Sequence, residues 1–112
     1  MDSFTHEAVV ALIGASTTAA PGGAVTVALC GHWEHEGPCR WPHNNAIATG
    51  AGPARFRTLF VAGDASSGQV RVRIERALRD GDGWSVVALR ARDVAADERE
   101  LAGRLLAGPR RG

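Results

Sequence analysis

"RFRTLFVAGDASSGQVRVRIERALRDGDGWSVVALRAR", residues 55–92, is the stretch that decides the fold. Its first segment, 55–63, is rich in aromatic and β-branched residues and ends at a glycine, which predicts a strand. Its last segment, 84–92, has the same character. A helix between two strands predicts a right-handed crossover, so we expect 84–92 to pair in parallel with 56–62.

The middle of this stretch is compatible with two structures. Val70, Ile74 and Leu78 recur every four residues, as on one face of a helix. The alternation of valines would also suit a strand, but a strand would place Arg76 on its apolar face. A hairpin through Asp80–Gly83 would then follow. We predict a helix over 67–79.

The flanking segments complete the predicted order. Apolar spacing predicts a helix over 3–14, and alternation of Val25, Val27 and Leu29 predicts a strand beginning at 24 and reaching 35. Small residues and glycines predict an irregular connection over 44–54, with at most a short edge strand. A last helix is expected within 93–109.

Together these segments predict one α+β domain over residues 1–112, with residues 109–112 frayed. The expected architecture is a small mixed sheet with helices packed on one face. Its order, helix-strand-loop-strand-helix-strand-helix, is broadly ferredoxin-like.

Charge and hydropathy limit the partners. The net charge is +1, and all 13 basic residues are arginine, which indicates a GC-rich bacterial genome. Arg71, Arg73, Arg76 and Arg79 spread around the predicted helix and form no phosphate-binding stripe, so nucleic acid is not an expected partner. No apolar run approaches the length of a membrane span, and the N-terminus lacks a basic region before an apolar one. We therefore expect a cytoplasmic protein with no membrane contact.

The side chains that can bind a metal are concentrated in "CGHWEHEGPCRWPH", residues 30–43, which holds both cysteines and three of the four histidines. Intracellular zinc prefers four Cys and His ligands in a tetrahedron. Cys30, His32, Cys39 and His43 are the expected ligands, with His35 as a substitute. A hairpin around residues 36–38 would bring the four to one face.

A fully ligated zinc ion has no open position for water, so this site would be structural. The fixed loop would present Trp41, Glu34, Glu36 and Arg40 to a protein partner or to a second copy of the chain. Glu34 would also orient His32 by a hydrogen bond.

Three alternatives remain open at this point. Cys30 and Cys39 could be free thiols in a globular protein without metal, or they could form a disulfide, which a reducing compartment disfavours. An open site of His32, His35 and one cysteine, with Glu34 or Glu36 as general base, would indicate an enzyme or a metal or redox sensor.

Overall fold

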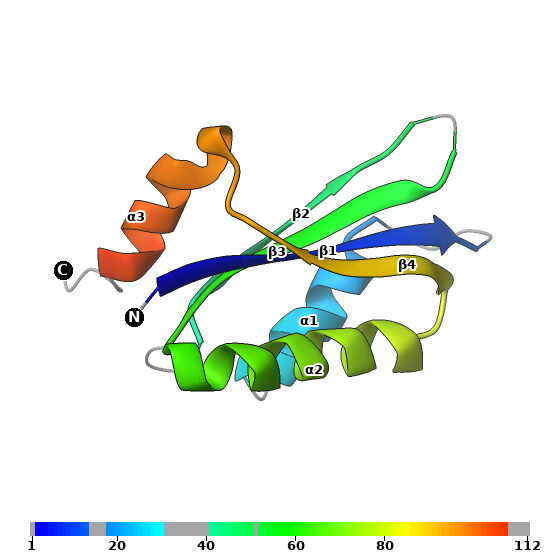
Figure 1. Cartoon of the computed structure of the whole chain (residues 1–112). Helices are drawn as coiled ribbons and strands as arrows, with labels where there is room; N and C mark the ends of the chain where they lie inside the picture. The colour runs from blue at the N-terminus through cyan, green and yellow to red at the C-terminus, as the bar shows by residue number, and fades with distance from the viewer. Residues whose placement is uncertain (1, 14–17, 31–40, 51, 108–112) are drawn as a thin grey trace, which may run out of the picture.

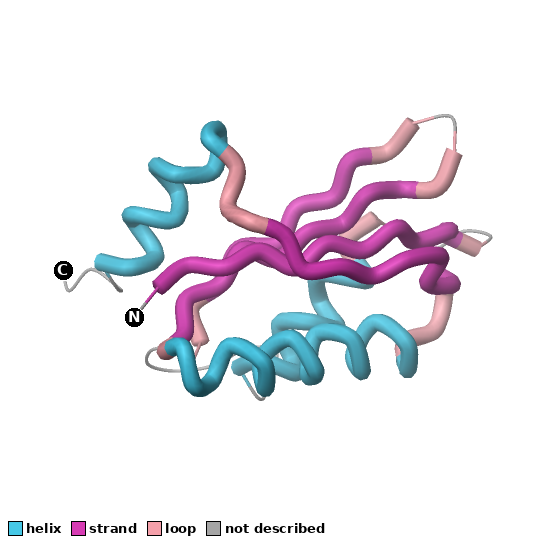
Figure 2. Tube along the Cα trace, viewed as in Figure 1, coloured by secondary structure: helices cyan, strands magenta, loops and turns pink. Residues whose placement is uncertain are grey.

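A computed structural model describes residues 2–13, 18–30, 41–50 and 52–107 (Figures 1 and 2). Its elements, in chain order, are β1 (Asp2–Leu12), α1 (Ala20–Cys30), β2 (His43–Ala48), β3 (Ala54–Ala62), α2 (Asp64–Asp80), β4 (Trp84–Arg92), the 3-10 turn η1 (Ala96–Glu98) and α3 (Arg99–Ala107). The class is α+β, as predicted. Within the described ranges no helix has the length and apolar character of a membrane span.

The four strands form one antiparallel sheet in the order β2-β3-β1-β4. The predicted mixed sheet and the predicted order of elements are therefore wrong. So is the parallel pairing of 84–92 with 56–62, because β1 lies between β3 and β4 and pairs antiparallel with both. β3 and β4 do run in the same direction, as a crossover through α2 requires.

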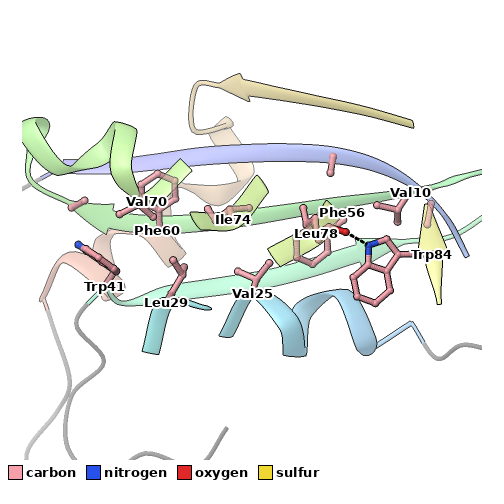
Figure 3. Close-up of a cluster of buried hydrophobic side chains, with 13 residues drawn as sticks. Val10, Val25, Leu29, Trp41, Phe56, Phe60, Val70, Ile74, Leu78 and Trp84 are labelled. Atoms are coloured by element: carbon pink, nitrogen blue, oxygen red, sulfur yellow. Dashed lines mark hydrogen bonds between the residues drawn. The ribbon is translucent and has the colours of Figure 1, made fainter. Parts of the chain in front are cut away.

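Helices α1 and α2 cover one face of the sheet (Figure 1). The core lies between these layers, and Figure 3 shows its side chains meeting from the two helices and from β1, β3 and β4. Val25 and Leu29 of α1 are buried in this core, and so are the three residues of α2 that the spacing predicted, Val70, Ile74 and Leu78. Burial of such side chains stabilises a fold by about 1.5–3 kcal/mol each.

The opposite face is covered at one end by α3, contrary to the prediction that all helices share a face (Figure 1). Leu59 and Val61 of β3 point away from the core residue Phe60, yet both are buried. Successive strand residues point to opposite faces, so a second, smaller apolar layer exists beneath α3. The predicted helix within residues 93–109 is confirmed by α3.

The prediction of a helix over 3–14 is wrong, because this segment is the central strand β1. Phe4, Ala8 and Leu12 are four apart, but they also belong to an alternating series that includes His6 and Val10. His6 and Val10 are both buried. A strand paired on both edges buries the whole alternating series, and this outweighs the helical spacing.

The predicted strand beginning at 24 is also wrong, because residues 20–30 form helix α1. Val25 and Leu29 are buried, whereas Val27, which the alternation placed with them, is 44% exposed. Pro21 is suited to a first helical turn. Tertiary packing on β3 overrides the low helix propensity of Gly22 and the residues around it.

Residues 43–48 form the edge strand β2, paired antiparallel with β3. This strand overlaps the start of the expected connection 44–54, for which a short edge strand was the expected exception. The helix over 67–79 and the strands over 55–63 and 84–92 are confirmed by α2, β3 and β4.

Candidate functional site

Two of the predicted zinc ligands belong to the described residues, one at the end of α1 and one at the start of β2. Cys30 is the last residue of α1, and His43 is the first residue of β2. His32, Glu34, His35 and Cys39, with Glu36 and Arg40, lie outside the described residues. Cys30 ends a helix, so the predicted strand through Cys30 is wrong; residues 31–40 of the predicted hairpin lie outside the described residues.

Trp41 occupies a different environment from the one predicted. Its side chain is 5% exposed and belongs to the core cluster with Leu29 and Phe60 (Figure 3). The guanidinium carbon of Arg73 lies 5.0 Å from the centroid of the Trp41 ring, a cation–π contact. Trp41 therefore anchors the chain before β2 to the core, and it is not the exposed partner contact that the sequence predicted.

His43 is held through both ring nitrogens. Nδ1 lies 3.0 Å from the carbonyl oxygen of Trp41, and Nε2 lies 3.2 Å from the hydroxyl of Thr26. A carbonyl oxygen can only accept, so Nδ1 carries the proton and donates. The lone pair of Nε2 then faces α1 and accepts the hydroxyl proton of Thr26.

A chain of hydrogen bonds extends from this histidine into the sheet. Thr58 donates to Oδ1 of Asn45 at 2.7 Å, and Nδ2 of Asn45 donates to the hydroxyl of Thr26 at 3.3 Å and to the carbonyl oxygen of Gly22 at 3.1 Å. Asn45 thus pins α1 to the edge of the sheet. A Cβ added at Gly22 would lie 3.4 Å from Cβ of Asn45, in ordinary van der Waals contact.

A pocket of about 410 Å³ lies between the first half of α1 and β2. Its polar lining comes from Thr18, Thr26, His43, Asn44 and Asn45, and small residues of α1 form the opposite wall. None of the lining residues carries a permanent charge.

Of the predicted metal ligands, the described residues include Cys30 and His43. Among residues 2–13, 18–30, 41–50 and 52–107, no three His, Cys, Asp or Glu side chains gather as a metal site would require. His43 nevertheless presents an imidazole lone pair beside the end of the helix that carries Cys30.

A second cluster, which the sequence analysis missed, joins β1 to α2. Nε2 of His6 lies 2.8 Å from Oε2 of Glu75, and Nη1 of Arg71 donates to Nδ1 of His6 at 3.0 Å. Arg71 also donates to the carbonyl oxygen of Thr5 at 2.7 Å. These partners are more than 60 residues apart in sequence, so no local motif could reveal them.

The chemistry of this cluster is structural. Arginine only donates, so Nδ1 of His6 accepts, and the proton on Nε2 is donated to Glu75. Burial lowers the pKa of His6 below 6.5, and the charge of Arg71 lowers it further, against the opposing effect of Glu75. His6 is neutral at pH 7, and both of its nitrogens are engaged, so neither is available as a general base.

A third polar network holds η1 to the outer face of the sheet. Arg57 and Arg92 both pair with Glu98, and Arg92 and Arg90 pair with Glu7. The hydrogen bonds from Arg92, with those from the backbone of Ala95 and the charge of Arg57, lower the pKa of Glu98 to about 2 despite its burial. This network positions α3 and shows no opening toward a ligand.

Comparison with protein-family models, with curated proteins and with solved structures finds no match for this chain.

Proposed function

We propose that this chain binds one structural zinc ion through Cys30, His32, Cys39 and His43, with His35 as the substitute ligand. The bound segment would present a protein-interaction surface that includes Glu34. The proposal assumes a reducing cytoplasm, where cysteines remain available as thiolate ligands.

The observation that carries the proposal is the hydrogen bonding of His43. Histidines that bind metal commonly donate their second ring N–H to a backbone carbonyl, which fixes the tautomer and orients the other nitrogen. His43 donates from Nδ1 to the carbonyl oxygen of Trp41 and keeps a lone pair on Nε2. The hydroxyl of Thr26 holds that lone pair by one neutral hydrogen bond, which a metal–nitrogen bond would replace.

The position of Cys30 adds support. Thr26, which contacts His43, lies four residues before Cys30, about 6 Å along the axis of α1. A helix end and a strand start would thus supply one ligand each, and the intervening segment would supply the rest.

For the fold we propose a grouping with the ferredoxin-like arrangements. The order β-α-β-β-α-β from β1 to β4, with β1 between β3 and β4, supports this grouping. The turn η1 and α3 are then additions at its C-terminal end. The grouping concerns architecture and carries no activity.

Metal analysis of protein purified without added metal tests the zinc proposal. We expect one zinc ion per chain and its loss in His43→Ala. The matched control is Thr26→Val, which removes the hydroxyl from Nε2 but no ligand, and which should retain the metal. A metal-free wild-type protein, or a His43→Ala variant with full zinc content, would refute the proposed ligand set.

A further inference from the structure

We propose that Asp82 is a site of spontaneous backbone modification, where the chain converts to isoaspartate through a succinimide formed with the nitrogen of Gly83. The neighbouring Asp80 is also followed by a glycine, but the fold protects it. The modification consumes no reagent other than water. It involves none of the residues of the proposed zinc site and goes beyond that proposal.

The reaction is a rearrangement of the main chain. The nitrogen of the residue after an aspartate attacks the carboxyl carbon of the side chain, a C–N bond forms, and the N–H proton leaves with the carboxyl hydroxyl as water. A second water molecule then opens the succinimide. If it breaks the new C–N bond, aspartate is restored. If it breaks the original peptide bond, the product is isoaspartate, in which the main chain runs through the side chain.

The sequence offers this reaction two equivalent places. Asp-Gly occurs twice in succession, as DGDG over residues 80–83. Glycine after the aspartate favours closure of the succinimide, because no side chain stands beside the attacking nitrogen. The structure separates the two dipeptides: Asp80 is the last residue of α2, whereas Asp82 lies in the turn between α2 and β4.

Asp80 is held against closure by the helix and by the indole of Trp84. Closure turns the peptide unit after the aspartate, so ψ of Asp80 would have to leave the helical value of about −42°. Gly81 lies against the indole, and a Cβ added there would overlap it. Trp84 is 7% exposed, and its N–H donates to the carbonyl oxygen of Leu78 at 2.8 Å (Figure 3). The peptide between Asp80 and Gly81 therefore turns only if a buried side chain is displaced.

Asp82 and Gly83 meet the requirements of closure. Asp82 is exposed, so its carboxyl group can turn toward the main chain and water can reach the succinimide. Gly83 has a φ of 99°, in the region that favours glycine. Its carbonyl oxygen accepts from the N–H of Ile13 at 2.8 Å, whereas its own N–H has no hydrogen-bond partner among the described residues. Loss of this N–H proton to the succinimide therefore costs the fold no hydrogen bond.

The product changes the connection between α2 and β4. Isoaspartate adds a carbon atom to the main chain between Gly81 and Gly83. Gly81 is fixed against Trp84, and Gly83 is fixed by its hydrogen bond to Ile13 beside the start of the pairing between β1 and β4. A longer connection between two fixed points loosens one of them. We therefore expect the isoaspartyl protein to have a lower melting temperature than the unmodified protein.

Peptide mapping of aged protein tests the proposal. The intact chain is incubated at pH 7 for several weeks, one sample folded in buffer and one unfolded in concentrated urea. A glutamyl endopeptidase then releases the peptide 76–98, which begins after Glu75 and ends at Glu98, and electron-based fragmentation locates isoaspartate within it. We expect isoaspartate at residue 82 and not at residue 80 in the folded sample, and at both residues in urea.

Two asparagine variants are the matched pair. Asparagine closes the same succinimide with loss of ammonia in place of water, so Asp82→Asn should release ammonia from the folded protein. Asp80→Asn, which creates the same dipeptide at the helix end, should release it about tenfold more slowly or less, as an added barrier of about 1.4 kcal/mol would require. In urea the two rates should be equal. Asp82→Glu keeps the charge but lengthens the side chain, and it should keep its melting temperature on ageing.

Three results would overturn the proposal. The first is equal conversion of residues 80 and 82 in the folded protein, which would show that the fold does not select between them. The second is conversion of residue 82 in urea but not in buffer. The third is release of ammonia from folded Asp80→Asn as fast as from folded Asp82→Asn.

Discussion

Arg57 and Glu98 form an ion pair, with Nε of Arg57 2.8 Å from Oε2 of Glu98, that joins the middle of β3 to the turn before α3. Arg92 binds the same carboxylate through both terminal nitrogens, at 3.0 and 3.1 Å, and the backbone N–H of Ala95 donates to it at 3.0 Å. Glu98 is thus the shared acceptor of β3, of β4 and of the backbone at Ala95, and it ties the turn before α3 to the sheet.

Glu98→Gln should destabilise the fold. The pKa of Glu98 is about 2 against an ordinary value of 4.5, which corresponds to roughly 3 kcal/mol of stabilisation of the charged form. Glu100→Gln is the matched control, because Glu100 is exposed on α3 and should change the free energy of unfolding little. Urea titrations at pH 7 measure both. Equal effects of the two substitutions would contradict the anchoring role of Glu98.

The same carboxylate sets an acid limit to stability. Its pKa is lowered in the folded protein, so its contribution is fully present above pH 4.5 and is lost as the pH falls toward 2. The wild-type free energy of unfolding should therefore decrease over this range more steeply than that of Glu98→Gln. Parallel pH profiles of the two proteins would show that the ion pairs of Glu98 contribute nothing.

His6 should produce a separate pH dependence at higher pH. Its folded-state pKa lies below 6.5, so the folded protein binds this proton less readily than the unfolded chain does. The stability that results is present above about pH 6.5 and is lost as the pH falls below it. His6→Gln should remove this part of the profile. An unchanged slope between pH 7 and 5 in that variant would show that His6 does not titrate on unfolding.

Gly81→Ala and Gly68→Ala should change the stability of the protein in opposite directions. A Cβ at Gly81 would overlap the ring of Trp84, whose indole N–H donates to the carbonyl oxygen of Leu78 at 2.8 Å. Displacing this buried ring should cost about 1–3 kcal/mol. Gly68 lies in α2 with open space around its Cβ position, so alanine there should stabilise the protein by about 0.5–1 kcal/mol. Melting temperatures compare the two directly.

His32→Ala should lose zinc, and His35→Ala should retain it, if His32 is the ligand and His35 only its substitute. Zinc contributes on the order of 10 kcal/mol to small structural sites. The chain has a separate core, so we expect His32→Ala to lower the melting temperature without unfolding the protein. Metal content and calorimetry check this. If only His35→Ala loses the metal, then His35 is the ligand and His32 is the substitute.

The C-terminal half of the fold was predictable because its signals agree with one another. In α2, Val70, Ile74 and Leu78 are the buried residues, as their spacing predicted. Its end at Asp80 lies one residue beyond the predicted end, whereas its start at Asp64 lies three residues before the predicted start. Local pattern and tertiary packing favour the same structure in this half.

The N-terminal half was not predictable from spacing alone. In β1 and α1 the apolar residues fit both a period of two and a period of four, and only the tertiary neighbours decide between them. Val10 is buried because β3 and β4 flank β1, and Val27 is exposed because α1 packs through Val25 and Leu29. The partners that decide the outcome lie far away in sequence.

The candidate site was predictable in composition but not in geometry. The clustering of Cys30 and His43 with the intervening residues is visible in the sequence, whereas the hydrogen bonds from His43 to Thr26 and Trp41 depend on a helix that the sequence pattern concealed. The clusters around His6 and Glu98 combine residues from distant elements, so no motif search could have identified them.

The central place of β1 makes the sheet depend on contacts that are distant in sequence. β1 pairs with residues 54–62 and with residues 84–92, and Thr5 pairs with Arg92. During synthesis β1 therefore gains its first sheet partner only after residues 54–62 have been made, and its second only after residues 84–92. Contacts this distant in sequence slow folding and leave apolar strands exposed meanwhile. The unpaired β1 is thus a target for chaperones that hold nascent chains.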